Sequence, residues 1–177
     1  MKLLPDITEN YPQQYARATK RLRTHPRSIR AIALLDKALV ALFAIVYAGL
    51  IAYSATSADF KLVRIIIVPA ISFVLASILR ASINEPRPYE RFDIDPLIVK
   101  NTCGKSFPGR HVFSATIISC ALAYVNLWAG VIGFAGVGLI AFTRIIGGVH
   151  FPRDIAAGIV LALLCGLIGF ELVPTFL

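Results

Sequence analysis

Five long runs of apolar residues constrain what this chain can fold into more than any other feature of its sequence. The chain has 177 residues, of which 57% are hydrophobic, and its mean hydropathy is +0.73. A soluble domain of this size needs more polar residues to cover its surface, so this composition is typical of a membrane protein. The runs lie at Ala38–Ala55, Leu62–Leu79, Val112–Trp128, Ala129–Phe142 and Ile155–Leu172.

Each apolar run is expected to be helical, because a bilayer offers the backbone no hydrogen-bond partners. A spanning helix needs about 20 residues, and the first, second and fifth runs reach that length with their flanking residues. The third and fourth runs share the 34 residues from His111 to Arg144, so we expect a tight hairpin that turns near residues 126–130. The sequence predicts a single all-α integral membrane domain with about five transmembrane helices.

A polar, basic arm at residues 1–37 precedes the membrane-embedded domain, which we place at residues 38–177. Apolar residues recur in the arm at helical spacing, with arginines and lysines between them. This pattern predicts an amphipathic helix on the bilayer surface, and a partly disordered basic leader is the alternative. No stretch of the arm resembles a cleavable signal peptide. The apolar positions are Tyr11, Tyr15, Ala18 and Leu22, and the basic ones are Arg17, Lys20, Arg21 and Arg23.

The formal net charge of +8 does not point to nucleic acid. The basic residues are concentrated in the arm and in a few loops, without a base-reading module or alternating aromatic and basic residues. A bilayer surface and an anionic substrate are the partners that this distribution favours. The sequence gives no indication of the oligomeric state.

Three clusters of polar residues lie at the ends of the apolar runs. Charged groups next to lipid are costly, so such residues are candidates for function. If each run crosses the membrane once, all three clusters lie at the same membrane surface. Arg80 and Arg87 follow the second run, Gly109, Arg110 and His111 precede the third, and Arg144, His150 and Asp154 connect the fourth to the fifth.

The residue types in these clusters suit phosphoryl transfer. The guanidinium groups of Arg80, Arg87 and Arg144 can each hold two phosphate oxygens. Two histidines can divide the roles of nucleophile and general acid. Asp154 follows His150 by four residues, a spacing at which the carboxylate can orient the imidazole. None of the clusters has the carboxylates of a magnesium site or the ligands of a zinc site, so we expect neither a metal nor another cofactor.

The order and spacing of these residues resemble the phosphatidic acid phosphatase type 2 superfamily. The motifs of that family read K-x6-RP, PSGH and SR-x5-H-x3-D. The corresponding segments here are Arg80-x6-Arg87-Pro88, Ser106-Phe107-Pro108-Gly109-Arg110-His111 and Thr143-Arg144-x5-His150-x3-Asp154.

The resemblance implies a role for each matched residue. Arg80, Arg87 and Arg144 would bind the phosphate. His150 would be the nucleophile that forms a phosphohistidine, and Asp154 would orient it. His111 would protonate the leaving oxygen and later activate water. The resemblance also implies catalysis without a metal.

The second motif departs from the family pattern. Gly109 stands where the family has a serine that binds a phosphate oxygen, and Arg110 stands where a glycine is usual. A backbone N–H at residue 109 or 110, or the Arg110 side chain, would then have to replace the hydroxyl. Arg80 in place of lysine and Thr143 in place of serine are milder changes.

The resemblance favours undecaprenyl pyrophosphate as the substrate, followed by phosphatidic acid and phosphatidylglycerol phosphate. One alternative is a phosphotransferase that passes the phosphoryl group to another lipid, and a second, motivated by Gly109, is a weakened enzyme that binds lipid phosphate.

Lys100 and Lys105 either contact a second phosphate or are solvated loop charges. We expect a multi-pass protein of the cell membrane. The excess of arginine and lysine in the arm favours an active site on the cytoplasmic face, although bacterial relatives that recycle carrier lipid are thought to work on the outer face.

Overall fold

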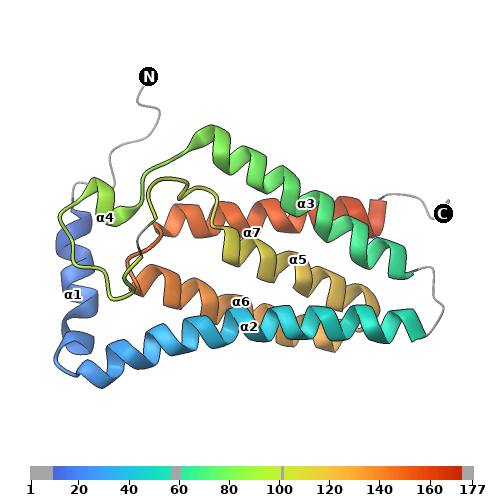
Figure 1. Ribbon diagram of the computed structural model, residues 1–177, viewed down its shortest axis with the longest axis horizontal. Coiled ribbons are helices and arrows are strands. Elements are labelled where there is room, and N and C mark those ends of the chain that lie inside the picture. Colours follow the sequence, from blue (N-terminus) through green and yellow to red (C-terminus); the bar gives the residue numbers. More distant parts are fainter. Residues whose placement is uncertain (1–9, 57–60, 101, 173–177) are drawn as a thin grey trace.

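The computed structural model describes residues 10–56, 61–100 and 102–172, and every regular element within these ranges is a helix. The all-α prediction is therefore confirmed. The elements are α1 (Tyr11–Arg23), α2 (Pro26–Thr56), α3 (Lys61–Ile83), α4 (Pro88–Arg91), α5 (Arg110–Val125), α6 (Leu127–Ile146) and α7 (Pro152–Gly166), which continues as π-helix η1 (Leu167–Leu172) (Figure 1).

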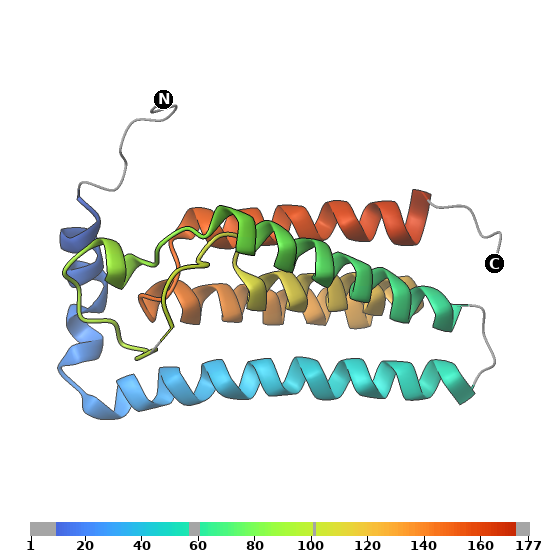
Figure 2. The same ribbon diagram turned by 45° about the horizontal axis from the view of Figure 1, so that its top comes forward.

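Helices α2, α3, α5, α6 and α7 run alongside one another and form an elongated bundle (Figures 1 and 2). Helix α5 packs against α3, α6 and α7, and half of its residues are buried, including Val112, Phe113 and Ala121. The outward-facing side chains of α2 and α3 are large and apolar, such as Ile45, Ile71 and Leu75. A bundle that exposes its apolar residues in this way is suited to lipid as its surroundings.

Among the residues that the structure describes, four helical segments have the length and apolar composition to cross a membrane: Pro26–Thr56, Lys61–Arg91, Leu127–Ile146 and Pro152–Leu172. Helix α5 has 16 residues, which correspond to about 24 Å, less than the roughly 30 Å hydrocarbon core of a bilayer. Because other helices surround α5, little of its surface has to match the bilayer thickness. Four of the five expected spans therefore meet the length criterion, and the remaining one, the third along the chain, stays a prediction.

The hairpin between α5 and α6 is tighter than the sequence suggested. Asn126 alone separates the two helices, and its side-chain oxygen accepts a hydrogen bond from the backbone N–H of Ala129 at 3.1 Å. Gly130 allows the helices to meet, since a Cβ atom there would lie 2.4 Å from the Cβ atom of Ala123. The expected turn near residues 126–130 is confirmed.

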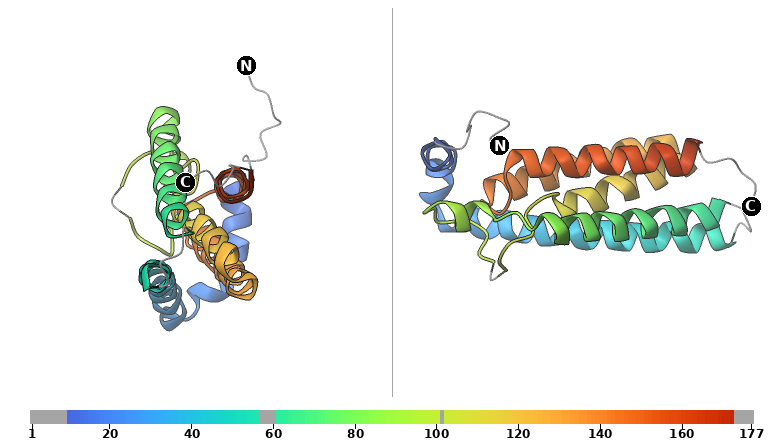
Figure 3. Two further views of the ribbon diagram at one scale, coloured as in Figure 1. Left: turned by 90° about the vertical axis from the view of Figure 1, so that its right-hand side faces the viewer. Right: turned by 90° about the horizontal axis from the view of Figure 1, so that it is seen from above.

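Helix α1 lies across one end of the bundle (Figure 3). Its buried residue Tyr15 donates a hydrogen bond from the hydroxyl group to the Ile146 carbonyl and accepts one from the Leu97 N–H, each at 3.1 Å. The arm is thus helical at residues 11–23, but its tyrosine face packs on the protein itself and Ala18 is exposed. Placement of the helix on the bilayer surface stays a prediction, and residues 1–9 lie outside the described part of the chain.

The first membrane helix begins earlier than its apolar run. Pro26 starts α2 at a position where proline is favoured, so the helix continues through the 37/38 boundary that we placed between arm and domain. The start of this helix was not predicted because the exposed residues Arg27, Arg30 and Lys37 interrupt the apolar pattern. Asp36, beside Lys37, is buried. The arm and the bundle are consequently joined by one continuous helix.

Candidate active site

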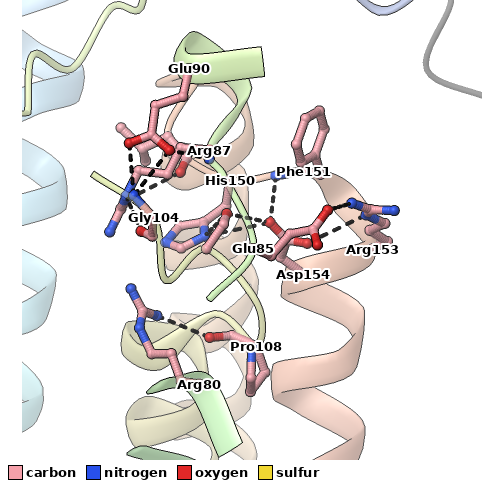
Figure 4. Close-up of polar contacts among 12 residues, drawn as sticks. Arg80, Glu85, Arg87, Glu90, Gly104, Pro108, His150, Phe151, Arg153 and Asp154 are labelled. Atoms are coloured by element: carbon pink, nitrogen blue, oxygen red, sulfur yellow. Dashed lines mark hydrogen bonds and ion pairs between the residues drawn. The ribbon is translucent and has the colours of Figure 1, made fainter. Parts of the chain in front are cut away.

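The three polar clusters meet at the end of the bundle that α1 covers, as expected from the order of the crossings (Figures 1 and 4). Arg87, with 4% of its surface exposed, donates from Nε to the Gly104 carbonyl at 3.2 Å and from Nη1 to the Val149 carbonyl at 3.3 Å. Arg80 donates from Nη1 to the Pro108 carbonyl at 3.0 Å. Arg80 thus joins the end of α3 to the residues just before α5, and Arg87 joins the loop after α3 to the α4–α5 loop and to the connection between α6 and α7.

The His150 imidazole lies in a buried chain of polar contacts (Figure 4). The Ser106 hydroxyl is 3.2 Å from His150 Nδ1 and donates to Asp154 Oδ2 at 2.5 Å, whereas Nδ1 and Oδ2 are 3.8 Å apart. Asp154 therefore acts on His150 mainly through Ser106. Because the hydroxyl proton points at the carboxylate, the hydroxyl oxygen can accept a hydrogen bond from the Nδ1–H group, and in this tautomer the lone pair lies on Nε2.

The electrostatic surroundings favour a neutral His150. Burial lowers its pKa to about 4, although the Asp154 carboxylate acts in the opposite direction. The positive charges of Arg87 and Arg144 also lower this pKa. Near pH 7 the imidazole is consequently unprotonated, the state that a nitrogen nucleophile needs.

Helix α5 begins at the site, with Arg110 as its first residue and His111 in its first turn. The first N–H groups of an α-helix have no partner within the helix and attract anions. The Gly109 N–H is not among the available donors, because it donates to the Asp154 carbonyl at 2.9 Å. Of the two backbone groups that we expected to replace the missing serine hydroxyl, the one at Gly109 is therefore already engaged, and the one at Arg110 stays a candidate.

Arg144 is paired with a residue that the sequence did not single out. Its Nε lies 2.8 Å from Asp36 Oδ1, and the same oxygen accepts a hydrogen bond from the Thr143 hydroxyl at 3.0 Å. Arg144 and Asp36 are only 2% and 4% exposed, while the Nη1 atom of Arg144 is buried without a hydrogen-bond partner. The acidic partner thus comes from α2 and leaves part of the guanidinium available to a ligand.

Two adjoining cavities open beside His111. The larger, of about 630 Å³, is lined by Asp36, Lys37, Lys100, His111 and Arg144, and by apolar residues of α2 and of the segment 97–99. The smaller, of about 170 Å³, lies between α2, α5 and α6 and includes Arg110 together with His111. An apolar wall that leads to a histidine and an arginine can accommodate a ligand with a hydrocarbon chain and an anionic head.

The expected site residues have different places in this arrangement. His150, Asp154, Arg87 and Arg144 form its buried centre, and Arg80 borders it. Gly109 contributes through close packing on α7. Ser106 and Asp36 are the additional residues, and of the two loop lysines Lys100 lines the cavity. Ser106 was already visible two residues before Pro108, whereas Asp36 carries no signal in the sequence beyond its charge.

Within the described ranges, no three His, Cys, Asp or Glu side chains are grouped so that they could hold a metal ion. Apart from the carboxylates of Asp154 and Asp36, which are paired with Ser106 and Arg144, the polar groups that converge at the site are guanidinium groups, imidazoles, a hydroxyl and backbone N–H groups. Such donors bind an anion directly.

Comparisons with known proteins agree with this arrangement. The family model described as the PAP2 superfamily matches residues 61–177, a range that holds all three motifs. Undecaprenyl-diphosphatase BcrC of Bacillus subtilis (strain 168) is 32% identical over 91 residues. That match covers 49% of this chain and 45% of the relative, so the similarity extends over about half of each protein.

Two solved structures share the fold. The crystal structure of Aquifex aeolicus LpxE superposes with a TM-score of 0.71 at 24% identity, over 90% of this chain and 93% of the other. The first transmembrane PAP2 type phosphatidylglycerolphosphate phosphatase from Bacillus subtilis gives a TM-score of 0.62 at 21% identity, over 97% and 91% of the two chains. At these identities the likeness extends to the arrangement of the helices.

Proposed function

The chain belongs to the PAP2 superfamily, and from this we propose that it is a metal-independent membrane phosphatase that hydrolyses a phosphomonoester or diphosphate of a lipid. The observation that carries the proposal is the buried His150–Ser106–Asp154 chain beside Arg87 and Arg144. It combines a neutral, oriented nucleophile with fixed positive charge for a phosphoryl group, the two requirements of this chemistry.

The first step of the proposed reaction forms a covalent intermediate. His150 Nε2 attacks the phosphorus atom while the bond from phosphorus to the leaving oxygen breaks. Arg80, Arg87 and Arg144 hold the other phosphate oxygens and stabilise the charge that develops on them. His111 donates a proton to the leaving oxygen, and the bound phosphate favours the protonated imidazole that this role requires.

The second step releases phosphate. His111, now neutral, accepts a proton from a water molecule that attacks the phosphohistidine. The bond between phosphorus and Nε2 breaks, and the electron pair returns to His150. The Ser106–Asp154 pair holds His150 in the same tautomer throughout, so the enzyme ends the cycle as it began.

The apolar lining of the cavity beside His111 supports a lipid substrate. Undecaprenyl pyrophosphate is our first candidate, because the name of the Bacillus subtilis relative gives that activity. Phosphatidylglycerol phosphate, in line with the name of a structural neighbour, and phosphatidic acid follow. The lipid identity is therefore best determined with a substrate panel.

The experiment is phosphate release by the purified protein in detergent from these three lipids, with a chelator present throughout. We expect turnover of at least one lipid without added metal. Loss of activity in the chelator, restored by a divalent cation, would contradict metal independence. Transfer of the phosphoryl group to an added acceptor lipid would identify a phosphotransferase, and tight binding without turnover would identify a binding protein.

Gly109 provides a prediction about the efficiency of this site. A Cβ atom at residue 109 would lie 3.2 Å from the Asp154 carbonyl oxygen and 3.3 Å from Ile155 Cδ1, so a side chain fits after a shift of a few tenths of an ångström. A serine hydroxyl that reaches a charged phosphate oxygen contributes about 1.5–3 kcal/mol. We expect Gly109→Ser to have a kcat/KM about tenfold above that of Gly109→Ala.

Gly109→Ala is the matched control, because it introduces the same Cβ atom without the hydroxyl. Comparing the two variants separates the hydrogen bond from the steric cost of any side chain against α7. Equal kcat/KM values for the alanine and serine variants would mean that the Arg110 N–H or side chain already fills this role.

We further propose that the active site faces the cytoplasm. The described part of the arm begins with α1 at the active-site end of the bundle, and the arm sequence holds eight arginines and lysines: Lys2, Arg17, Lys20, Arg21, Arg23, Arg27, Arg30 and Lys37. At the opposite end α3 begins with Lys61 and Arg64. An excess of basic residues in short segments marks the cytoplasmic side.

Cys103 allows this orientation to be tested, because it is exposed in the loop between α4 and α5. In intact cells or spheroplasts, a membrane-impermeant thiol reagent should label Cys103 only after the membrane is permeabilised. Cys103→Ser controls for labelling of Cys120 and Cys165, which lie within helices. Labelling of Cys103 in sealed membranes would place the site on the outer face.

A further inference from the structure

We propose that Lys100 forms a second anion subsite, which binds the inner phosphate of a lipid diphosphate. This inference rests on the proposed phosphatase function and specifies lipid diphosphates as the substrate class that the cavity accommodates. Lys100 follows the buried pair Leu97 and Ile98 and is half-buried at the wall of the 630 Å³ cavity. Lys105, the other lysine of this loop, is exposed and is not among the residues that line the cavity.

Lys100 lies on the side of the site where the inner phosphate of a diphosphate substrate would be. His150 attacks the terminal phosphorus, and His111 protonates the bridging oxygen as its bond to that phosphorus breaks. The inner phosphate is attached to the bridging oxygen and must lie on the His111 side of the site. Lys100 and Arg144 line the cavity on that side together with His111. The departing lipid monophosphate would thus form next to a lysine.

The charges around Lys100 favour an anion there. Within the described ranges no carboxylate forms an ion pair with Lys100, and the one acidic residue that lines the cavity, Asp36, is paired with Arg144. Burial, together with Arg144 and Arg87, lowers the pKa of Lys100 to about 8. A half-buried cation that is held near other cations gains strongly from a bound anion. A monophosphate at the arginines would leave the Lys100 ammonium without such a partner.

The lining beyond Lys100 fits the remainder of such a substrate. On α2 the cavity is bounded by Ala33, Val40, Ala41 and Ala44, which are small or apolar. A hydrocarbon chain attached to the inner phosphate can lie along these residues. The order from the centre outwards is therefore nucleophile, terminal phosphate, inner phosphate and lipid chain.

The first test compares farnesyl diphosphate with farnesyl phosphate as substrates, since they differ only in the inner phosphate. Lys100→Gln should lower kcat/KM about tenfold more for the diphosphate than for the monophosphate, in line with the loss of one charged contact. Lys105→Gln, a matched change on the same loop, should leave the ratio of the two substrates as in the wild type. An equal effect of Lys100→Gln on both substrates would overturn the subsite.

A binding measurement keeps the test independent of turnover. Methylenediphosphonate, which cannot be hydrolysed, should raise the Tm of the wild-type protein in detergent more than orthophosphate does, and Lys100→Gln should remove that difference. A difference that persists in Lys100→Gln would overturn the subsite. If methylenediphosphonate binds through Lys100 while neither farnesyl ester is hydrolysed, the proposed phosphatase function fails and the anion subsite stands.

Discussion

Replacing His150 by alanine is expected to reduce kcat by at least about a thousandfold, because removing a covalent nucleophile normally costs several orders of magnitude. The side chain is 1% exposed, and its Nδ1 is held by Ser106, so a neighbouring residue cannot readily take its place. Phosphate release from the best lipid of the panel measures the loss. A His150→Ala protein that keeps more than about a tenth of the wild-type rate would contradict the mechanism.

His25→Ala is the matched control, since His25 is exposed in the connection between α1 and α2. The covalent intermediate can also be observed directly. His111→Ala should slow the attack of water, so a substrate whose leaving group needs no proton should accumulate phosphate on this variant. That phosphate should be acid-labile, lie on His150 and be absent from a His111→Ala/His150→Ala double variant. Acid-stable phosphate would point to a different nucleophile.

The sequence was sufficient to predict the parts of this protein that depend on local periodicity and on the order of crossings. Apolar runs gave the membrane helices, and alternating crossings placed Arg87, His111 and His150 at one end of the bundle, where the structure has them. Both inferences are local or topological. They require no knowledge of how the side chains of different helices pack.

Features that depend on packing between distant segments were not predictable. Asp36 lies 108 positions before Arg144 in a stretch that looks like a basic arm, and only the approach of α2 to α6 brings the two together. Spacing alone suggested that Asp154 orients His150, but it gave no sign that Ser106 from a separate loop would contact both residues. The sequence of the arm predicted an amphipathic helix. An amphipathic pattern alone cannot distinguish a bilayer from the protein's own surface as the partner of Tyr15.

The second large effect is expected at Asp36, which we infer to be a positioning residue for Arg144. Removing one partner of a buried ion pair leaves the other charge without compensation and typically costs about 3–5 kcal/mol of stability. Asp36→Ala should therefore lower the Tm of the protein markedly. Asp95→Asn is the matched control, because the Asp95 side chain is 83% exposed in its pair with Arg23, and such surface pairs contribute at most about 1 kcal/mol.

A positioning role predicts more than lower stability. Asp36→Asn keeps the shape of the side chain and an oxygen for the Thr143 hydroxyl, but loses the charge that holds the Arg144 Nε at 2.8 Å. If Arg144 then no longer binds a phosphate oxygen with one charge-assisted hydrogen bond, kcat/KM should fall about 10–100-fold. Orthophosphate should inhibit the variant more weakly by a similar factor, which a purely structural role would not cause.

A double-mutant cycle decides whether the effect of Asp36 acts through Arg144. Residues in contact show losses that do not add, so Asp36→Asn should cost little further activity once Arg144 is replaced by alanine. Additive losses, or wild-type inhibition by orthophosphate in Asp36→Asn, would mean that Asp36 serves stability alone. A non-additive result would make α2 part of the active site. The family model, which matches residues 61–177, does not include α2 or Asp36. The wall of the cavity and the charge that orients the phosphate-binding arginine would then be supplied by the same helix.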